Sequence, residues 1–138
     1  MGFGQVSGGE RSIRILLVDD NPEFLRSAER FLRHQPGFEI VESARSGSQA
    51  LWKVRTDHID VVVLDMVMPG INGLEITRVL KTMQFPPKII VHSFLNAEEY
   101  RSRALASGAD AFVGKDAFVE RVTGIIAALC GGGGTHPG

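Results

Sequence analysis

The sequence predicts an α/β protein in which five parallel strands form one sheet with helices on both faces, a doubly wound (βα)5 arrangement. Two observations support this fold class. Strand-like and helix-like segments alternate five times along the chain. Residues 13–18 and 61–64 are nearly unbroken apolar runs, which is typical of strands buried on both faces of a parallel sheet. The length of 138 residues suits one domain of this kind.

The first half of the chain contains two strand–helix units. After the strand at 13–18, an asparagine and a proline at 21–22 supply an N-cap and a first helical residue. A Pro-Gly pair at 36–37 ends that helix. Residues 38–42 alternate apolar and polar, which indicates a half-exposed strand, and the segment 46–49 fits a capping box that opens the second helix.

The second half of the chain repeats the pattern three times, with strands expected at 61–64, 88–91 and 111–113. Asn72 and Glu75 can cap the helix after the third strand. Asn96 is expected to open the next helix, and Gly108 to end it. A helical stripe of apolar residues within 118–129 predicts the last helix.

Strand positions in the sheet follow from these patterns. The unbroken apolar runs belong at the centre, whereas the alternating second strand and the short fifth strand suit the edges. The predicted strand order is therefore 2-1-3-4-5, a flavodoxin-like topology. We expect a folded domain at residues 13–129, a flexible N-terminal segment at 1–12, and a Gly-rich tail or linker remnant at 130–138.

Composition excludes several classes of function. The 15 basic and 16 acidic side chains are scattered and give a net charge of −1, so we expect no direct binding of nucleic acid. No apolar run approaches the roughly 20 residues of a membrane span, so we expect no membrane contact. With one cysteine and no secretory signal pattern, the expected location is the cytoplasm.

Chemically active residue types follow the predicted strands at the edge where parallel sheets bind ligands: Asp19, Asp20, Asp65, Ser93 and Lys115. Three converging carboxylates repel one another, and Mg²⁺ or a similar hard ion such as Mn²⁺ would relieve the repulsion. With an ammonium group and a hydroxyl beside them they suit phosphoryl transfer, in which an aspartate can be the nucleophile. Taken singly, each has an ordinary structural explanation as a cap, a turn residue or a solvated charge, and their convergence favours a site. His92, just before Ser93, is expected to be a packed residue.

The chain resembles the receiver domains of bacterial two-component response regulators, over roughly residues 13–129. The resemblance rests on Leu-Leu-Val-Asp-Asp-Asn at 16–21, on Asp-Met-Val-Met-Pro-Gly-Ile-Asn-Gly at 65–73, on Ser93, and on Gly-Ala-Asp-Ala-Phe-Val-Gly-Lys-Asp at 108–116. It is most similar to receivers that precede a helix-turn-helix output domain. A self-phosphorylating signalling domain, rather than a metabolic enzyme, is what the resemblance implies.

The resemblance assigns roles at the site. Asp65 would accept a phosphoryl group from a sensor histidine kinase or a phosphotransfer protein. Asp20, Asp65 and the main-chain carbonyl of Val67 would ligate Mg²⁺ directly, and Asp19 would act through a bound water. Lys115 would neutralise phosphoryl oxygens.

The resemblance also implies a conformational switch. Ser93 would hydrogen-bond a phosphoryl oxygen and swing inward, and Phe112, the switch aromatic, would follow it. The output surface, at which a homodimer would form, spans residues 96–129. Phe112 lacks the hydroxyl of the tyrosine that is frequent at this position. Val67 and Leu95 are apolar where relatives can carry polar side chains that orient water, and Phe94 is large, which predicts slow loss of the phosphoryl group.

Three alternatives remain open from the sequence. The chain can be the N-terminal receiver part of a DNA-binding transcription regulator whose output domain is absent from it. It can be a docking module that works without phosphorylation. An aspartyl-nucleophile phosphatase ranks below both, because such enzymes carry Asp-x-Asp after the first strand, whereas Asp65 follows the third.

Overall fold

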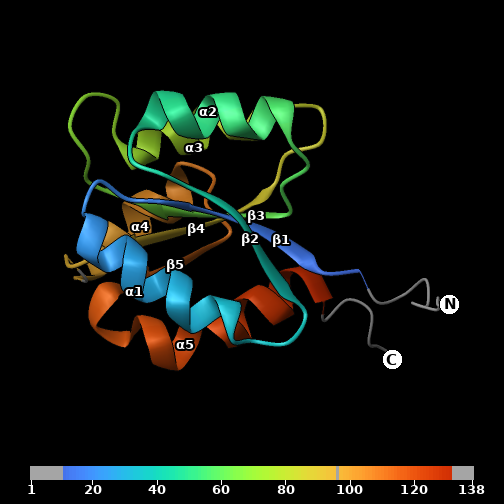
Figure 1. Ribbon diagram of the computed structural model, residues 1–138. Coiled ribbons are helices and arrows are strands. Elements are labelled where there is room, and N and C mark those ends of the chain that lie inside the picture. Colours follow the sequence, from blue (N-terminus) through green and yellow to red (C-terminus); the bar gives the residue numbers. More distant parts are fainter. Residues whose placement is uncertain (1–10, 96, 132–138) are drawn as a thin grey trace, which may run out of the picture.

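The computed structural model describes residues 11–95 and 97–131, which form one sheet of five parallel strands with helices on both faces. The strands stand in the order β2-β1-β3-β4-β5 (Figure 1). Their bounds are Ile13–Val18 for β1, Phe38–Ala44 for β2, Val61–Asp65 for β3, Lys88–Ser93 for β4 and Ala111–Gly114 for β5. The doubly wound, flavodoxin-like α/β fold and its strand order 2-1-3-4-5 are therefore confirmed.

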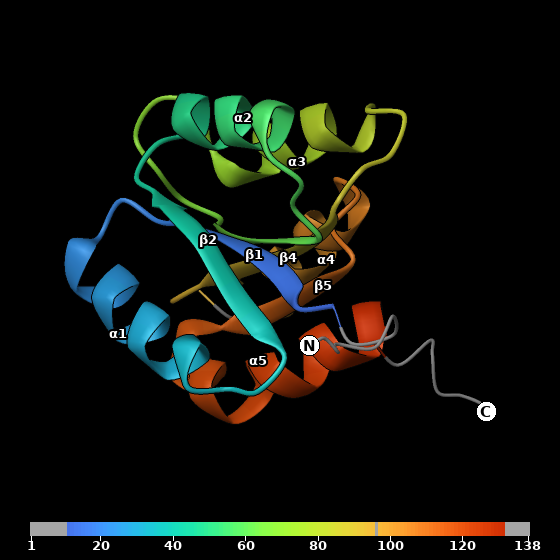
Figure 2. The same ribbon diagram turned by 45° about the vertical axis from the view of Figure 1, so that its right-hand side comes forward.

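Helices cover the two faces of the sheet unequally (Figure 1, Figure 2). Residues of α1 and α5 pack against one face, and residues of α2, α3 and α4 pack against the other. The bounds are Pro22–Arg33 for α1, Gly47–Thr56 for α2, Gly73–Lys81 for α3, Glu98–Ala106 for α4 and Phe118–Ile126 for α5, which continues into a π-helical turn at Ala127–Gly131. Within the described residues, no helix is long and apolar enough to cross a membrane.

The two central strands contribute to both cores of the protein. Leu16 and Val18 of β1 belong to the core under α2, α3 and α4, and Ile15 and Leu17 belong to the core under α1 and α5. All five residues of β3 are buried. Because a slip of one residue would exchange the two faces of a strand, this double burial fixes the pairing register. The register in turn decides which residues meet at the carboxyl edge of the sheet.

Two of the predicted helix starts are confirmed. The side chain of Asn21 accepts the backbone N–H groups of Glu23 and Phe24, at 2.9 and 3.2 Å. Asn72 and Glu75 form the expected reciprocal capping box, with distances of 3.0 and 3.2 Å. Both caps satisfy N–H groups that a helix leaves unpaired in its first turn.

The predicted start of the second helix at Ser46 is confirmed without its full capping box, and the predicted start of the fourth at Asn96 is not tested. Ser46 Oγ accepts the N–H of Gln49 at 3.2 Å, as expected, but Gln49 Oε1 accepts the N–H of Arg45 at 2.8 Å. The expected full capping box is therefore wrong, because the glutamine side chain reaches one residue beyond the cap. The predicted cap Asn96 lies outside the described residues, and Ala97 occupies the N-cap position of α4.

The predicted end segments lie mostly outside the described residues. Of the segment 1–12, the structure describes Arg11 and Ser12, which are exposed and precede β1. Of the segment 130–138, it describes Cys130 and Gly131, which complete the turn after α5.

Gly73, the first residue of α3, lies against the chain that leaves β3. Its N–H donates to the carbonyl of Met66 at 3.0 Å. A Cβ atom placed on Gly73 would collide with the carbonyl oxygen of Asp65 and would lie 2.9 Å from the Cα of Met66. Since these contacts are with backbone atoms, a rotated side chain could not relieve them. This glycine therefore sets how closely α3 approaches the end of β3.

We expect Gly73→Ala to lower the free energy of unfolding by about 1–3 kcal/mol, because the overpacking outweighs the better helix propensity of alanine. Gly124→Ala in α5 is the matched control, since beyond the chain neighbours and the local helix backbone no described atom would lie within 4 Å of the new Cβ. The control should raise stability by roughly 0.5–1 kcal/mol. Urea unfolding of both variants tests this, and equal effects of the two substitutions would contradict it.

Candidate functional site

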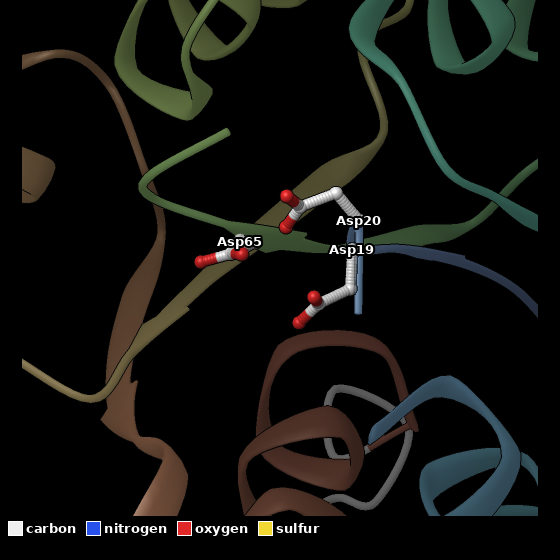
Figure 3. A group of neighbouring side chains, drawn as sticks. All are labelled: Asp19, Asp20 and Asp65. Carbon is white, nitrogen blue, oxygen red and sulfur yellow. The ribbon is translucent and has the colours of Figure 1, made fainter. Parts of the chain in front are cut away.

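Three carboxylates meet at the carboxyl edge of the sheet. Val18 pairs with Leu64, so the residues that follow them, Asp19 and Asp65, are level with one another. Asp19, Asp20 and Asp65 each offer an oxygen, and these oxygens lie within 4.8 Å of one another. Figure 3 shows that Asp19 and Asp20 leave the end of β1 on opposite sides, with Asp65 beside them. The strand ends that the sequence singled out are thus brought together.

Lys115 brings a positive charge into this cluster from the end of β5. Its Nζ lies 2.7 Å from Asp19 Oδ2 and 3.5 Å from Asp65 Oδ2. The same atom lies over the rings of Phe24 and Phe94, 4.7 and 4.8 Å from their centroids. The side chain is only 4% exposed, so the ammonium group is a buried part of the site and not a solvated surface charge.

Asp65 is held in place but is costly to ionise. Its Oδ1 accepts the N–H of Val67 at 3.2 Å. Burial raises the pKa of Asp65 from 3.8 to about 6, and the neighbouring charge of Asp19 adds to the rise, while Lys115 and the Val67 N–H oppose it. At neutral pH Asp65 is still mostly a carboxylate, but burial destabilises its charge, and additional positive charge would stabilise it.

Asp19 is completely buried at the start of α1. Its Oδ1 accepts the N–H of Asn21 at 2.8 Å, while its Oδ2 faces Lys115. Within the part of the chain that the structure describes, Lys115 pairs with Asp19 and Asp65, and Asp20 adds a third carboxylate, which leaves an excess of negative charge among oxygen ligands. A hard divalent cation fits this donor set, because Mg²⁺ prefers carboxylate, carbonyl and water oxygens.

A cleft of about 510 Å³ opens over the cluster and gives access to Asp65. It is lined by Asp20, Asn21, Asp65, Val67, Ser93, Phe94, Leu95 and Lys115. Three of these residues form an exposed apolar rim, with Val67 57% exposed, Phe94 69% and Leu95 45%. The entrance to the carboxylates therefore combines polar walls, which include the carboxylates themselves, with an apolar rim on one side.

The two residues expected to switch lie on the same face of the sheet. Val91 pairs with Phe112, and Ser93 stands two residues further along β4, so their side chains point to the same side. Ser93 is buried and its Oγ accepts the N–H of Leu95 at 2.9 Å. Phe112 is buried in the core that also contains Ala104 of α4.

His92 is a packed residue, as expected, but it lies closer to the carboxylates than the sequence indicated. Its Nε2 lies 3.4 Å from the carbonyl oxygen of Val18 and 3.7 Å from Asp19 Oδ2. Burial, helped by the charge of Lys115, lowers the pKa of His92 to about 3, so the ring is neutral. The signal in the sequence is one polar ring directly after the apolar run at 89–91.

Comparison with known proteins identifies the family. The family model for the response regulator receiver domain matches residues 15–127. The transcriptional regulatory protein DegU of Brevibacillus brevis is 33% identical over 132 residues, which cover 93% of this chain and 55% of DegU. The response regulator UvrY of Escherichia coli (strain K12) is 32% identical over 120 residues, covering 87% of this chain and 55% of UvrY.

A solved structure gives the same result. The two-component response regulator of the LuxR family from Aurantimonas sp. SI85-9A1 superposes with a TM-score of 0.82 and 27% identity, covering 88% of this chain and 86% of that one. The chain spans about half the length of the curated relatives it matches. It belongs to the receiver domains of two-component response regulators and is related to transcriptional regulators.

Proposed function

We propose that Asp65 accepts a phosphoryl group from a phosphohistidine of a sensor histidine kinase or a phosphotransfer protein, in a reaction that requires Mg²⁺. The observation that supports this most is the buried Lys115 ammonium group between Asp19 and Asp65, 2.7 and 3.5 Å from their oxygens, below a cleft open to solvent. That arrangement suits a nucleophilic carboxylate that must receive a group carrying further negative charge.

In the proposed step, a carboxylate oxygen of Asp65 attacks phosphorus. The bond from phosphorus to the donor imidazole nitrogen breaks, and the bond from phosphorus to the Asp65 oxygen forms. The imidazole nitrogen keeps the electron pair and takes a proton from solvent. The N–H of Val67 holds Asp65 Oδ1 throughout, and Lys115, beside Oδ2, neutralises the arriving phosphoryl oxygens.

Asp20, Asp65 and the main-chain carbonyl of Val67 would hold Mg²⁺ or Mn²⁺, with Asp19 acting through a water molecule. When bound, the cation supplies charge neutralisation for the carboxylates and for the transferring phosphoryl group. The positive charge would also lower the pKa of Asp65, which burial raises, and would so favour the nucleophilic carboxylate.

The proposed signal is a change of surface at α4, β5 and α5. Ser93 Oγ would stop accepting the N–H of Leu95 and would instead donate a hydrogen bond to a phosphoryl oxygen. Phe112 would then move toward the space that Ser93 leaves. Phe112 has no hydroxyl, so its movement would act through packing alone. A homodimer through this surface, within residues 96–129, is the form of output we propose.

Because its curated relatives are about twice as long, we also propose that the domain works as the receiver part of a transcription regulator in the cytoplasm. The relatives named above are themselves called a transcriptional regulatory protein and a response regulator. A docking module that needs no phosphorylation is the second candidate, and reaction with acetyl phosphate separates the two.

Incubation with acetyl phosphate and Mg²⁺ should add one phosphoryl group to the chain, detected by intact-mass spectrometry. Asp65→Asn should abolish the adduct, because it removes the nucleophile, and removal of Mg²⁺ by a chelator should do the same. Asp57→Asn is the matched control, since that aspartate pairs with Lys53 at the end of α2 outside the carboxylate cluster. An unmodified chain, with Mg²⁺ binding confirmed separately, would favour the docking module instead.

Asp65→Asn should also stabilise the metal-free protein at pH 7, by about 1–3 kcal/mol, because ionising Asp65 in the fold costs roughly what its pKa rise indicates. The folded pKa of about 6 lies above the ordinary 3.8, so the native state holds the proton more tightly. The penalty is therefore complete above pH 6 and fades as the pH falls toward 4.

Urea unfolding at pH 7 and pH 4.5 measures this difference between wild type and Asp65→Asn. Saturating Mg²⁺ should stabilise the wild type more than the variant, because the cation binds only the native cluster. A variant that is less stable than wild type at pH 7 without metal would show that the carboxylate is not the strained group.

Val67→Asn should shorten the lifetime of the phosphorylated domain by roughly tenfold, the effect of about one hydrogen bond to the attacking water. Val67 and Leu95 offer no polar atom on their side chains beside Asp65, so the wild type should hold its phosphoryl group for longer. Loss of the adduct with time, followed by mass spectrometry, measures the lifetime, with Val67→Ile as the apolar control. A wild-type lifetime much shorter than that of Val67→Asn would refute the slow-release prediction.

A further inference from the structure

His92 is a buried imidazole to which the proposed function gives no role. The ring is 1% exposed and packs against two phenylalanines that also contact each other, with centroid distances of 5.0 Å to Phe24 and 5.9 Å to Phe118. Its Nδ1 has no hydrogen-bond partner among the described residues. A polar ring that is fully buried needs at least one good partner to offset its lost hydration.

The surroundings of the ring define its tautomer. Nε2 faces two oxygens, the carbonyl of Val18 at 3.4 Å and Asp19 Oδ2 at 3.7 Å, and both can only accept a hydrogen bond. A neutral imidazole carries one N–H. That proton therefore belongs on Nε2, where it is shared loosely between two acceptors and makes a short bond with neither.

The Asp19 oxygen that His92 approaches is the one that Lys115 holds. Lys115 Nζ lies 2.7 Å from Asp19 Oδ2 and only 3.5 Å from Asp65 Oδ2, so the ammonium group sits mainly on Asp19. A phosphoryl group on Asp65 adds negative charge on the far side of Lys115 and draws the ammonium group toward it. Asp19 Oδ2, completely buried, then loses its nearest cation.

We propose that His92 is a positioning residue that takes over Asp19 Oδ2 when Lys115 turns to the phosphoryl group. This inference rests on the proposed function of Asp65. The Nε2–H of His92 leaves the carbonyl of Val18 and donates to Asp19 Oδ2. A ring movement of under about 1 Å brings the 3.7 Å separation into hydrogen-bond range.

The position of His92 in β4 supports this exchange. Consecutive residues of a strand point to opposite faces, so His92 and Ser93 stand on the two sides of the same strand end. Ser93 lines the cleft over Asp65, whereas His92 packs among residues of α1 and α5. One strand end thus carries a donor to the phosphoryl group on one face and a donor to Asp19 on the other.

The test compares two variants with wild type, using beryllofluoride and Mg²⁺ as the stand-in for a phosphoryl group. His92→Leu keeps an apolar side chain of similar bulk and removes the donor, and His92→Gln keeps an N–H donor near the position of Nε2. We expect His92→Leu to weaken beryllofluoride binding by roughly tenfold or more, since a hydrogen bond to a buried carboxylate is lost only in the bound state. Its affinity for Mg²⁺ alone should change by less than about twofold, and His92→Gln should restore most of the binding.

A spectroscopic measurement reports on the hydrogen bond itself. In ¹H–¹⁵N spectra of the imidazole groups, His92 of the free protein should be the Nε2–H tautomer. Its Nε2 proton should move downfield when beryllofluoride and Mg²⁺ are added, because its acceptor becomes a carboxylate. In Asp65→Asn the proton should stay where it is.

Each outcome decides between distinct explanations. An Nδ1–H tautomer, or equal beryllofluoride affinity of wild type and His92→Leu, overturns the role of His92 and leaves the proposed function intact. A loss in His92→Gln as large as in His92→Leu shows that the ring only packs, and overturns the role as well. Failure of the wild type to bind beryllofluoride overturns the proposed function, and this inference with it.

Discussion

The site depends on one buried ammonium group that must serve two buried carboxylates. Lys115 lies 2.7 Å from Asp19 and 3.5 Å from Asp65, and its side chain is almost inaccessible to water. Burial makes each of these charges expensive, and one positive group cannot offset three negative ones. The metal-free site therefore carries an excess of negative charge, which additional positive charge would stabilise. A bound cation would offset this excess of negative charge. Under the proposed function, a phosphoryl group on Asp65 would draw the ammonium group from Asp19 toward Asp65.

Strand pairing and helix capping hold the buried charges of the site close together. Strands β1 and β3 are buried on both faces, so the pairing that aligns Val18 with Leu64 cannot slip without exchanging two cores. Asp19 follows directly and also accepts the N–H of Asn21, which caps α1. Gly73 lets α3 approach the carbonyl of Asp65 more closely than any side chain would allow. The residues that end the strands and begin the helices are therefore the same residues that form or position the site.

Most of the fold, and the carboxylate cluster, could be predicted because both follow from periodicity and from where strands end. Residues after parallel strands reach the same edge whatever the details of packing. The sequence could not show which neighbour a side chain meets. Gln49 reaches Arg45 instead of completing a capping box, and Lys115 is buried between rings although a lone lysine is most often solvated. The sequence predicts that His92 is packed, but the approach of His92 to Asp19 depends on how β1, β4 and α5 come together.

Phosphorylation can shift a conformational equilibrium only by as much as the contacts of the phosphoryl group differ in free energy between the two conformations. Under the proposed function, Ser93 gives up the N–H of Leu95, which then needs a new acceptor. Leu95 belongs to the chain that leads from β4 into α4. The N-cap residue of that helix, Ala97, makes no side-chain capping bond, and a single residue within the helix, Ala104, is buried. Under the proposed function, the segment that would rearrange is therefore attached to the α-helix with the fewest buried residues, which would direct the response toward α4.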